Sequence, residues 1–92
     1  MIRSFKDRDT RAFYEGKRVK RFQPFRAQAE RKLRMLDAAS ELADLAAIPG
    51  NRLELLVGDR QGRHSIRIND QRRICFKWEK GRASDVEIVD YH

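Results

Sequence analysis

The last three residues of the chain, Asp90, Tyr91 and His92, carry side chains that can take part in proton transfer. An imidazole with an ordinary pKa near ~6.5 can accept or donate a proton at neutral pH, and a carboxylate can act as a base or orient one. A phenol can donate a hydrogen bond or stack on a nucleobase. These residues follow the apolar stretch 86–89, which is typical of a β-strand. The sequence therefore predicts a set of acid–base groups at the end of a strand.

Cleavage of RNA without a metal ion is one reaction that such a set can perform. The 2′-hydroxyl attacks the phosphate, one group accepts its proton, another protonates the leaving 5′-oxygen, and cations stabilise the developing charge. Arg73 and Arg67 can bind a phosphate through paired hydrogen bonds. Arg63 and Lys77 fall on the same predicted face of the sheet. In this hypothesis the end of the chain supplies proton-transfer groups and the neighbouring strands supply cations.

The chain carries a formal net charge of +7 over 92 residues, with 21 Lys and Arg against 14 Asp and Glu. So strong a positive field favours a polyanionic partner, which can be nucleic acid, an acidic protein or an anionic lipid surface. The charge is uneven, because residues 1–35 and 58–82 are basic while residues 36–57 and 83–92 are acidic. Two basic blocks therefore flank an acidic middle.

Composition also excludes several classes of protein. A single cysteine, Cys75, rules out a disulfide within the chain, and one cysteine with two distant histidines does not make a closed zinc site. We expect neither a metal ion nor a cofactor. The first ten residues lack the apolar stretch of a signal peptide, and no stretch approaches the length of a membrane span. The sequence predicts one domain, over residues 1–92, of a cytoplasmic protein.

Helical periodicity is confined to the first half of the chain. Asp9 or Thr10 is expected to cap a short first helix. Pro24 suits the first turn of a longer helix, and over residues 23–48 the pattern predicts two helical pieces or one broken helix. The apolar stripe of this region recurs at three and four residues, as one face of a helix requires. It consists of Phe25, Ala29, Leu33 and Leu36.

After the Pro-Gly pair at 49–50 the period changes to two, and turn residues divide the remaining chain into four short strands. The strands lie in the segments RLELLVGDRQG, RHSIRIND, QRRICFKWEKG and SDVEIVDYH, and the opening MIRSF is typical of a further short strand. Short connections between successive strands indicate an antiparallel meander. The predicted fold class is α+β, with two to three N-terminal helices packed on one face of a small antiparallel β-sheet.

Counting in twos assigns the side chains of these strands to two faces. One face is apolar and should pack under the helices: Leu53, Leu55, Val57, His64, Ile66, Ile68, Ile74, Phe76, Trp78, Val86 and Ile88. The other is polar and mainly basic: Glu54, Arg63, Ser65, Arg67, Arg73, Cys75, Lys77 and Glu87. A polar face is often only solvated surface in a two-layer domain. The concentration of arginine favours anion binding instead.

Each candidate residue also has a purely structural interpretation. A terminal histidine such as His92 is commonly a surface residue, Tyr91 can simply cover the end of the sheet, and Glu54 can be a solvated strand residue. His64 lies in phase with the apolar set, so we expect a half-buried histidine there. Cys75 has no histidine nearby in the sequence and is expected to be a small packing residue.

A resemblance to a known family runs over essentially the whole chain. It rests on the opening MIRSF, the helix AERKLRMLDAASELADL, the segment PGNRLELLVGDRQGRHSIRINDQRRICFKW and the ending VEIVDYH. In these segments the chain resembles HigB-type toxins of the RelE superfamily, close to the GraT branch. The resemblance implies a microbial-ribonuclease-like fold and a toxin that cleaves mRNA in the ribosomal A site without metal or cofactor. It also implies a HigA-type helix-turn-helix antitoxin as partner, with operator DNA bound only through the toxin–antitoxin complex.

The resemblance assigns roles to residues that match the motifs of the family. It implies that Arg73 binds the scissile phosphate, that Asp90 and His92 do acid–base work, and that Tyr91 stacks on or orients a base. Glu54 stands where well-studied HigB proteins carry a histidine. Val57 stands where those proteins carry a lysine, and the missing charge favours a moderate toxin. Glu54, Asp90 and His92 are therefore all candidates for the general base.

Two other functions fit the same sequence. A non-catalytic module that binds rRNA or DNA needs only the charge of +7. A ParE-like inhibitor of DNA gyrase keeps the superfamily and changes the target, although it has no need for a phosphate-binding arginine with a terminal imidazole. Binding to a membrane surface is the weakest alternative, because the apolar stripe of the long helix is narrow and the core needs it.

Overall fold

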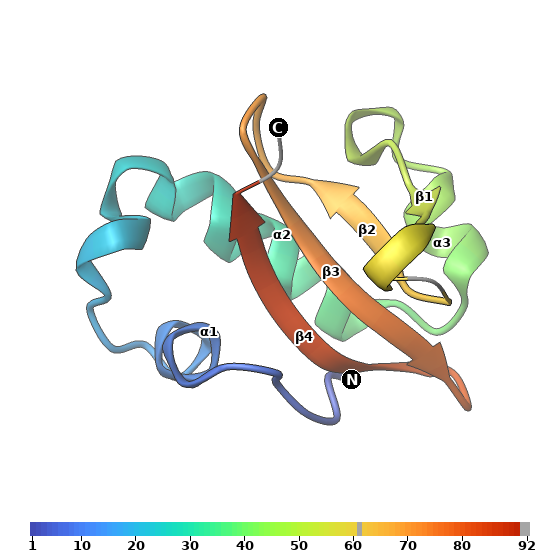
Figure 1. Cartoon of the computed structure of the whole chain (residues 1–92), viewed down its shortest axis with the longest axis horizontal. Coiled ribbons are helices and arrows are strands. Elements are labelled where there is room, and N and C mark those ends of the chain that lie inside the picture. Colours follow the sequence, from blue (N-terminus) through green and yellow to red (C-terminus); the bar gives the residue numbers. More distant parts are fainter. Residues whose placement is uncertain (61, 91–92) are drawn as a thin grey trace.

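The computed structural model of the chain describes residues 1–60 and 62–90, so the predicted site residues Tyr91 and His92 lie outside the described residues. The elements in chain order are α1 (Arg8–Tyr14), the 3₁₀ helix η1 (Lys20–Phe25), α2 (Arg26–Ala38), α3 (Leu42–Ala46), the 3₁₀ helix η2 (Pro49–Asn51), β1 (Glu54–Leu55), the 3₁₀ helix η3 (Gly58–Arg60), β2 (His64–Arg67), β3 (Arg72–Glu79) and β4 (Arg82–Asp90). The strands form one antiparallel sheet in the order β1-β2-β3-β4 (Figure 1). The predicted α+β class is confirmed.

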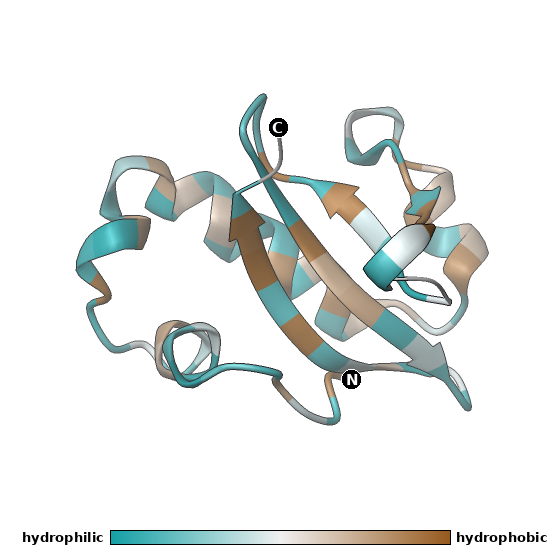
Figure 2. Ribbon diagram, in the orientation of Figure 1, coloured by the Kyte–Doolittle hydropathy of each residue, from teal (hydrophilic) through white to brown (hydrophobic). Residues whose placement is uncertain are grey.

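The apolar face of the sheet packs against α2, which lies behind the strands in the view of Figure 1. Figure 2 shows apolar and polar residues alternating along β4 and a continuous apolar stretch in the middle of β3. The core combines aromatic residues from the first helices with the inward residues of the strands. Each fully buried Leu, Ile or Phe side chain in it contributes about 1.5–3 kcal/mol. The core residues are Phe13, Phe22, Phe25, Ala29, Leu33, Leu36, Ala39, Leu45, Ile66, Ile68, Ile74, Phe76, Ala83, Val86 and Ile88.

The helical half differs from the prediction in where the helices begin. Pro24 lies inside η1, and α2 begins two residues later, at Arg26, because the chain first completes a 3₁₀ turn that buries two phenylalanines. A break between α2 and α3 confirms the prediction of two helical pieces over residues 23–48. Within the described part of the chain, no helix combines the length and apolar character that a membrane span requires.

The opening residues lie beside β4 but do not form the predicted strand. Ile2 and Phe5 make isolated parallel bridges to Ala83 and Val86. The Ser4 carbonyl accepts a hydrogen bond from the Val86 N–H at 3.1 Å. The first residues of the chain therefore protect the outer edge of the strand that leads to the candidate acid–base residues.

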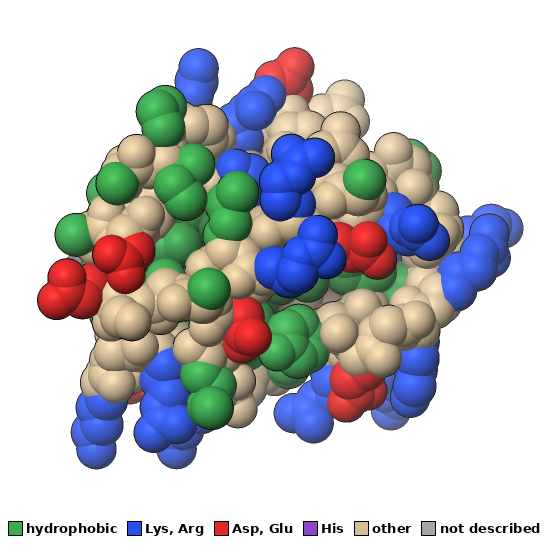
Figure 3. Space-filling model, turned by 180° about the vertical axis from the view of Figure 1, so that it is seen from behind, with side chains coloured by type: hydrophobic (Ala, Val, Ile, Leu, Met, Phe, Trp, Pro, Cys, Tyr) green, Lys and Arg blue, Asp and Glu red, His purple; other side chains and the backbone are tan. Residues whose placement is uncertain are grey.

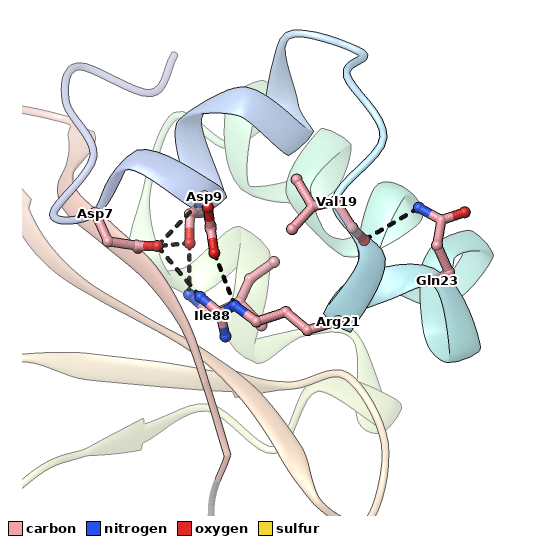
Figure 4. A network of polar contacts seen from close by, with 7 residues as sticks. Asp7, Asp9, Val19, Arg21, Gln23 and Ile88 are labelled. Atoms are coloured by element: carbon pink, nitrogen blue, oxygen red, sulfur yellow. Dashed lines mark hydrogen bonds and ion pairs between the residues drawn. The ribbon is translucent and has the colours of Figure 1, made fainter.

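Thr10 continues this protection at the next N–H group along the edge of β4. Its hydroxyl accepts the Ile88 N–H at 3.1 Å and donates to the Asp7 carboxylate at 2.6 Å. Asp7, and not Asp9 or Thr10 as predicted, caps α1, because its side chain accepts the Thr10 N–H at 3.0 Å. Figure 4 shows Arg21 extending from η1 toward the same acidic pair, Asp7 and Asp9. This cluster ties α1 and η1 to β4 two residues before Asp90.

The face assignment for the first strand was wrong for Leu55 and Val57, although Leu53 packs against the core as expected. Leu55 is 65% exposed and Val57 is 83% exposed, whereas Leu56 is only 5% exposed and lies outside the core cluster. Pairing with β2 lasts for only two residues, so counting in twos does not extend beyond them. Arg52 adopts a left-handed conformation with φ of 44° just before the strand, which also resets the direction of the side chains.

A β-bulge interrupts the pairing of the two longest strands. The register shifts between Cys75 and Lys77, and Asp85 on β4 adopts a left-handed conformation with φ of 49°. Asp tolerates this conformation better than most residues. The bulge presents the Asp85 carbonyl to the guanidinium of Arg63, which donates a hydrogen bond to it. The bend of β4 at Asp85 thus supplies the hydrogen-bond acceptor for the buried guanidinium of Arg63.

His64 and Cys75 occupy the structural positions that the sequence predicted. His64 is half-buried and stacks on Phe76, with 6.0 Å between the ring centroids. Its Nδ1 atom is buried and has no hydrogen-bond partner among the described residues. Burial lowers the pKa of the His64 imidazole below its ordinary value. Cys75 is fully buried, as a packing residue would be.

Replacing Thr10 by valine should lower the free energy of unfolding by about 1–3 kcal/mol, because the Ile88 N–H loses its acceptor inside the protein. Urea denaturation measures this loss. Thr10→Ser keeps the hydroxyl group and should retain most of the stability. An unfolding midpoint for Thr10→Val equal to that of the wild type would show that the hydroxyl does not hold β4.

The lowered pKa of His64 should make stability depend on pH. Native His64 takes up its proton at lower pH than unfolded His64, so the unfolded state binds more protons between the two pKa values. Stability should therefore be complete above the ordinary histidine pKa of about 6.5 and fall as the pH is lowered toward the native pKa. Urea denaturation at pH 7.5 and 5.5 measures the loss, which His64→Phe should reduce. An equal loss in both proteins would assign the effect to other groups.

Candidate active site

The polar face of the sheet is centred on Arg73, whose side chain is only 8% exposed. The alternative of a merely solvated face does not hold for its central residues, because Arg63, Ser65, Arg73 and Cys75 are all buried. In Figure 1, η3 lies in front of the strands, on the side opposite α2. A permanently charged guanidinium in such a position requires hydrogen-bond acceptors from the protein itself.

Three acceptors hold the Arg73 side chain in one orientation. Its Nε atom donates to the hydroxyl of Ser65 at 2.7 Å, and Ser65 lies diagonally across from it on β2. Its Nη2 atom donates to the carbonyl of Arg52 and, at 3.4 Å, to the carbonyl of Ser65. These partners come from β2 and from the turn before β1, so the guanidinium joins the sheet to the segment that covers its polar face.

The Arg52 carbonyl is itself positioned by a buried polar pair beneath it. Lys32 of α2 donates a hydrogen bond to the Asn51 side chain, and the Asn51 amide donates to the Leu45 carbonyl at 3.1 Å. Asn51 is fully buried and Lys32 is nearly so. Burial, with the nearby charges of Arg31 and Arg67, lowers the pKa of Lys32. The turn that supplies Arg73 with its acceptor is therefore anchored to α2.

Glu54 is the acidic neighbour of Arg73. It lies opposite Ser65 in the pairing of β1 with β2, and its carboxylate oxygen is 3.9 Å from Arg73 Nη2. The Glu54 side chain is 49% exposed, so its carboxylate lies between the buried guanidinium of Arg73 and the solvent. The structure therefore brings together Arg73 and Glu54, two of the residues that the sequence predicted for the site.

Asp90 lies on the other face of the sheet. It pairs with Arg72 across β3 and β4, and its carboxylate is 3.1 Å from Arg72 Nη1. The guanidinium of Arg72 lies over the Phe25 ring, 5.1 Å from its centroid, on the side of the helices. Neighbouring residues of a strand point to opposite faces, so Arg72 with Asp90 and Arg73 with Glu54 occupy opposite faces.

The remaining predicted cations all have partners in the protein. Arg63 is buried, bonded to the Asp85 carbonyl and 3.9 Å from the Glu87 carboxylate. Arg67 forms an ion pair with Asp70, and Lys77 Nζ lies 3.5 Å from the Asp85 carboxylate. The side chains of Arg67 and Lys77 are 32% and 48% exposed, so both reach solvent, whereas Arg63 serves the fold.

Two participants escaped the sequence analysis. Ser65 was assigned to the polar face, but its role as the acceptor for Arg73 depends on cross-strand register, which no local pattern reveals. The position of Arg72 could have been predicted, because adjacent residues of a strand point to opposite faces and Arg73 was assigned to the polar face. Among residues 1–60 and 62–90, no three or more His, Cys, Asp or Glu side chains gather as metal ligands.

Comparison with known proteins identifies the family. The sequence profile of the HigB-like toxin family, described as the RelE-like toxin of the type II toxin–antitoxin system HigB, matches residues 3–92. Toxin HigB-1 of Vibrio cholerae serotype O1 is 42% identical over 85 residues, which cover 90% of each chain. An uncharacterized protein of Haemophilus influenzae is 38% identical over 58 residues, which cover 63% of this chain and 57% of that protein. The chain therefore belongs to the HigB-like family of RelE-like toxins of type II toxin–antitoxin systems, a membership that implies an antitoxin partner.

Proposed function

We propose that the chain is a ribosome-dependent endoribonuclease that cleaves mRNA in the ribosomal A site. The attack is that of the 2′-hydroxyl on the adjacent phosphate, with acid–base assistance and without a metal ion. One observation carries the proposal: in a toxin of this family, the guanidinium of Arg73 is held by Ser65 and Arg52 beside the exposed carboxylate of Glu54.

Arg73 is the residue to which the proposal assigns the scissile phosphate. A cation that the protein already orients does not have to reorganise when negative charge develops, and it acts more strongly where water is partly excluded. The pair with Glu54 keeps the charges balanced until the phosphate arrives. Glu54 is on the solvent side of that pair, where it can accept the 2′-proton.

Proton transfer is shared in this proposal between Glu54 and His92. His92 can protonate the leaving 5′-oxygen, and Tyr91 can stack on a base. Asp90 was a candidate base, but its ion pair with Arg72 favours a different role, in which it holds the end of β4. The residues that would bind phosphates on either side are Arg67 and Lys77, since both reach solvent.

The partner in this proposal is a HigA-type antitoxin, and operator DNA is bound only through the complex of the two proteins. A toxin that acts on translating ribosomes works in the cytoplasm. The exposed Val57 contributes no charge to the RNA-binding surface, which supports the hypothesis of a moderate toxin.

Cleavage of mRNA on programmed ribosomes tests the proposal, with the ends of the RNA mapped by primer extension. Arg73→Lys should lower the rate by about 100- to 1000-fold, because lysine cannot reproduce the fixed guanidinium. His92→Ala and Glu54→Gln should each lower it by about 100-fold or more. His64→Phe, on the opposite face of the sheet, and Arg31→Lys, on the exposed face of α2, are controls and should cleave as the wild type does.

Different outcomes reject different parts of the proposal. The absence of cleavage at any codon by the wild-type protein would reject the activity, and a gyrase supercoiling assay would then examine the ParE-like alternative. Cleavage at undiminished rate by both Arg73→Lys and His92→Ala would reject the assigned residues while leaving the activity in place. Salt-dependent RNA binding without cleavage would favour the non-catalytic module.

Ser65 and Ser84 offer a matched pair of substitutions for the role of Arg73. Ser65→Ala removes the acceptor of Arg73 Nε, and Ser84→Ala removes a hydrogen bond of 2.8 Å to Glu79 elsewhere in the same sheet. Each variant should lose about 1–3 kcal/mol of stability. Only Ser65→Ala should also lower kcat, by about 10-fold, with little change in KM. Equal loss of activity in both variants would mean that Ser65 acts only through stability.

A further inference from the structure

An open cleft of about 730 Å³ lies between α1 and the chain that joins it to α2. This region is at the edge of the molecule beyond β4, and Figure 3 shows Lys and Arg side chains projecting along that edge. Five of the eight residues that line it are basic. The lining residues, here called the α1–η1 cleft, are Arg8, Asp9, Ala12, Lys17, Arg18, Val19, Lys20 and Arg21. None of them belongs to the candidate active site.

One of the five cations is already used by the fold. Arg21 Nε donates to the Asp9 carboxylate at 2.9 Å, and its Nη2 lies 3.5 Å from the Asp7 carboxylate (Figure 4). Its guanidinium also lies over the Phe22 ring, 4.3 Å from the centroid. Arg21 therefore fixes the wall of the cleft and neutralises its acidic residue.

The other cations leave the cleft strongly positive. Arg8, Arg18 and Lys20 are exposed, and none of their side chains makes a hydrogen bond or ion pair with the described residues of the chain. Lys17 lies 3.8 Å from the Glu15 carboxylate, and both of these side chains are largely solvated. Uncompensated like charges gathered in one cleft cost free energy in the isolated protein, and an anionic partner removes that cost.

The floor of the cleft distinguishes between two kinds of anionic partner. Ala12 and Val19 contribute small aliphatic surface to it, and none of the lining residues is aromatic. Grooves that bind single-stranded nucleic acid combine cations with aromatic side chains on which bases stack. A small aliphatic floor inside a basic rim instead fits an amphipathic peptide, with aliphatic side chains inward and carboxylates outward.

We propose that the α1–η1 cleft is the docking site of an acidic, amphipathic segment of the cognate antitoxin. Membership of the family supplies the partner, so this inference does not depend on the proposed ribonuclease activity. The segment places its aliphatic side chains on Ala12 and Val19, and its carboxylates pair with Arg18 and Lys20. Binding there leaves Arg73 and Glu54 uncovered by this segment.

Binding of the full-length toxin to its cognate antitoxin tests the proposal by titration calorimetry. The double variant Arg18→Glu/Lys20→Glu should weaken the affinity by about 100-fold, because two attractions become repulsions. The control Arg31→Glu/Arg34→Glu makes the same change of charge on the exposed face of α2 and should stay within about 3-fold of the wild type. The milder Arg18→Gln/Lys20→Gln should weaken binding by about 10-fold, and thermal unfolding verifies that each variant is folded.

A charge exchange makes the test specific for the contact. Acidic residues of the antitoxin segment replaced by lysine should restore binding to Arg18→Glu/Lys20→Glu and weaken binding to the wild type. Wild-type affinity of the cleft variants, or equal loss in the α2 control, would overturn the proposal. A cleft variant that keeps its antitoxin affinity but loses binding to a 12-nucleotide oligouridylate would show an RNA surface instead, which also overturns it.

Discussion

The buried guanidinium of Arg73 is the constraint on which the architecture of the polar face depends. Arginine stays charged at any pH that a cell reaches, so its donors need acceptors wherever the fold places them. Ser65 supplies one from the neighbouring strand and Arg52 supplies another from the turn before β1. That turn is held by Asn51 of η2, which accepts a hydrogen bond from Lys32 of α2, so the contacts of Arg73 extend to the helical layer of the domain.

The parts of the fold that were predictable are those in which one period extends over many residues. The stripe from Ala29 to Leu36 lies on one face of α2, and the alternation along β3 and β4 puts Ile74, Phe76 and Ile88 in the core, as expected. Counting failed for the two-residue strand β1, where Leu55 and Val57 are exposed. Arg52 sets the path of the backbone there. Its left-handed conformation cannot be predicted from the neighbouring residues of the sequence.

Of the residues predicted for the candidate site, the structure brings some together and separates others. Arg73 and Glu54 do meet, but Asp90 belongs to the opposite face together with Arg72. The register of the strands and their bulges decide which side chains meet. Arg63, for example, reaches its acceptor only because β4 bends at Asp85. Side-chain alternation alone was sufficient to separate the two arginines, whereas the carbonyl partners of Arg63 and Arg73 could be known only from the folded backbone.

The pairing of the opening residues with β4 has a consequence for the rate of folding. Ile2 and Phe5 contact Ala83 and Val86, so the contacts that protect the edge of β4 join segments that lie far apart in the sequence. Closing so long a loop costs conformational entropy before the contacts repay it. A fold that protects its edge strand in this way therefore has a higher contact order than the meander of neighbouring strands alone.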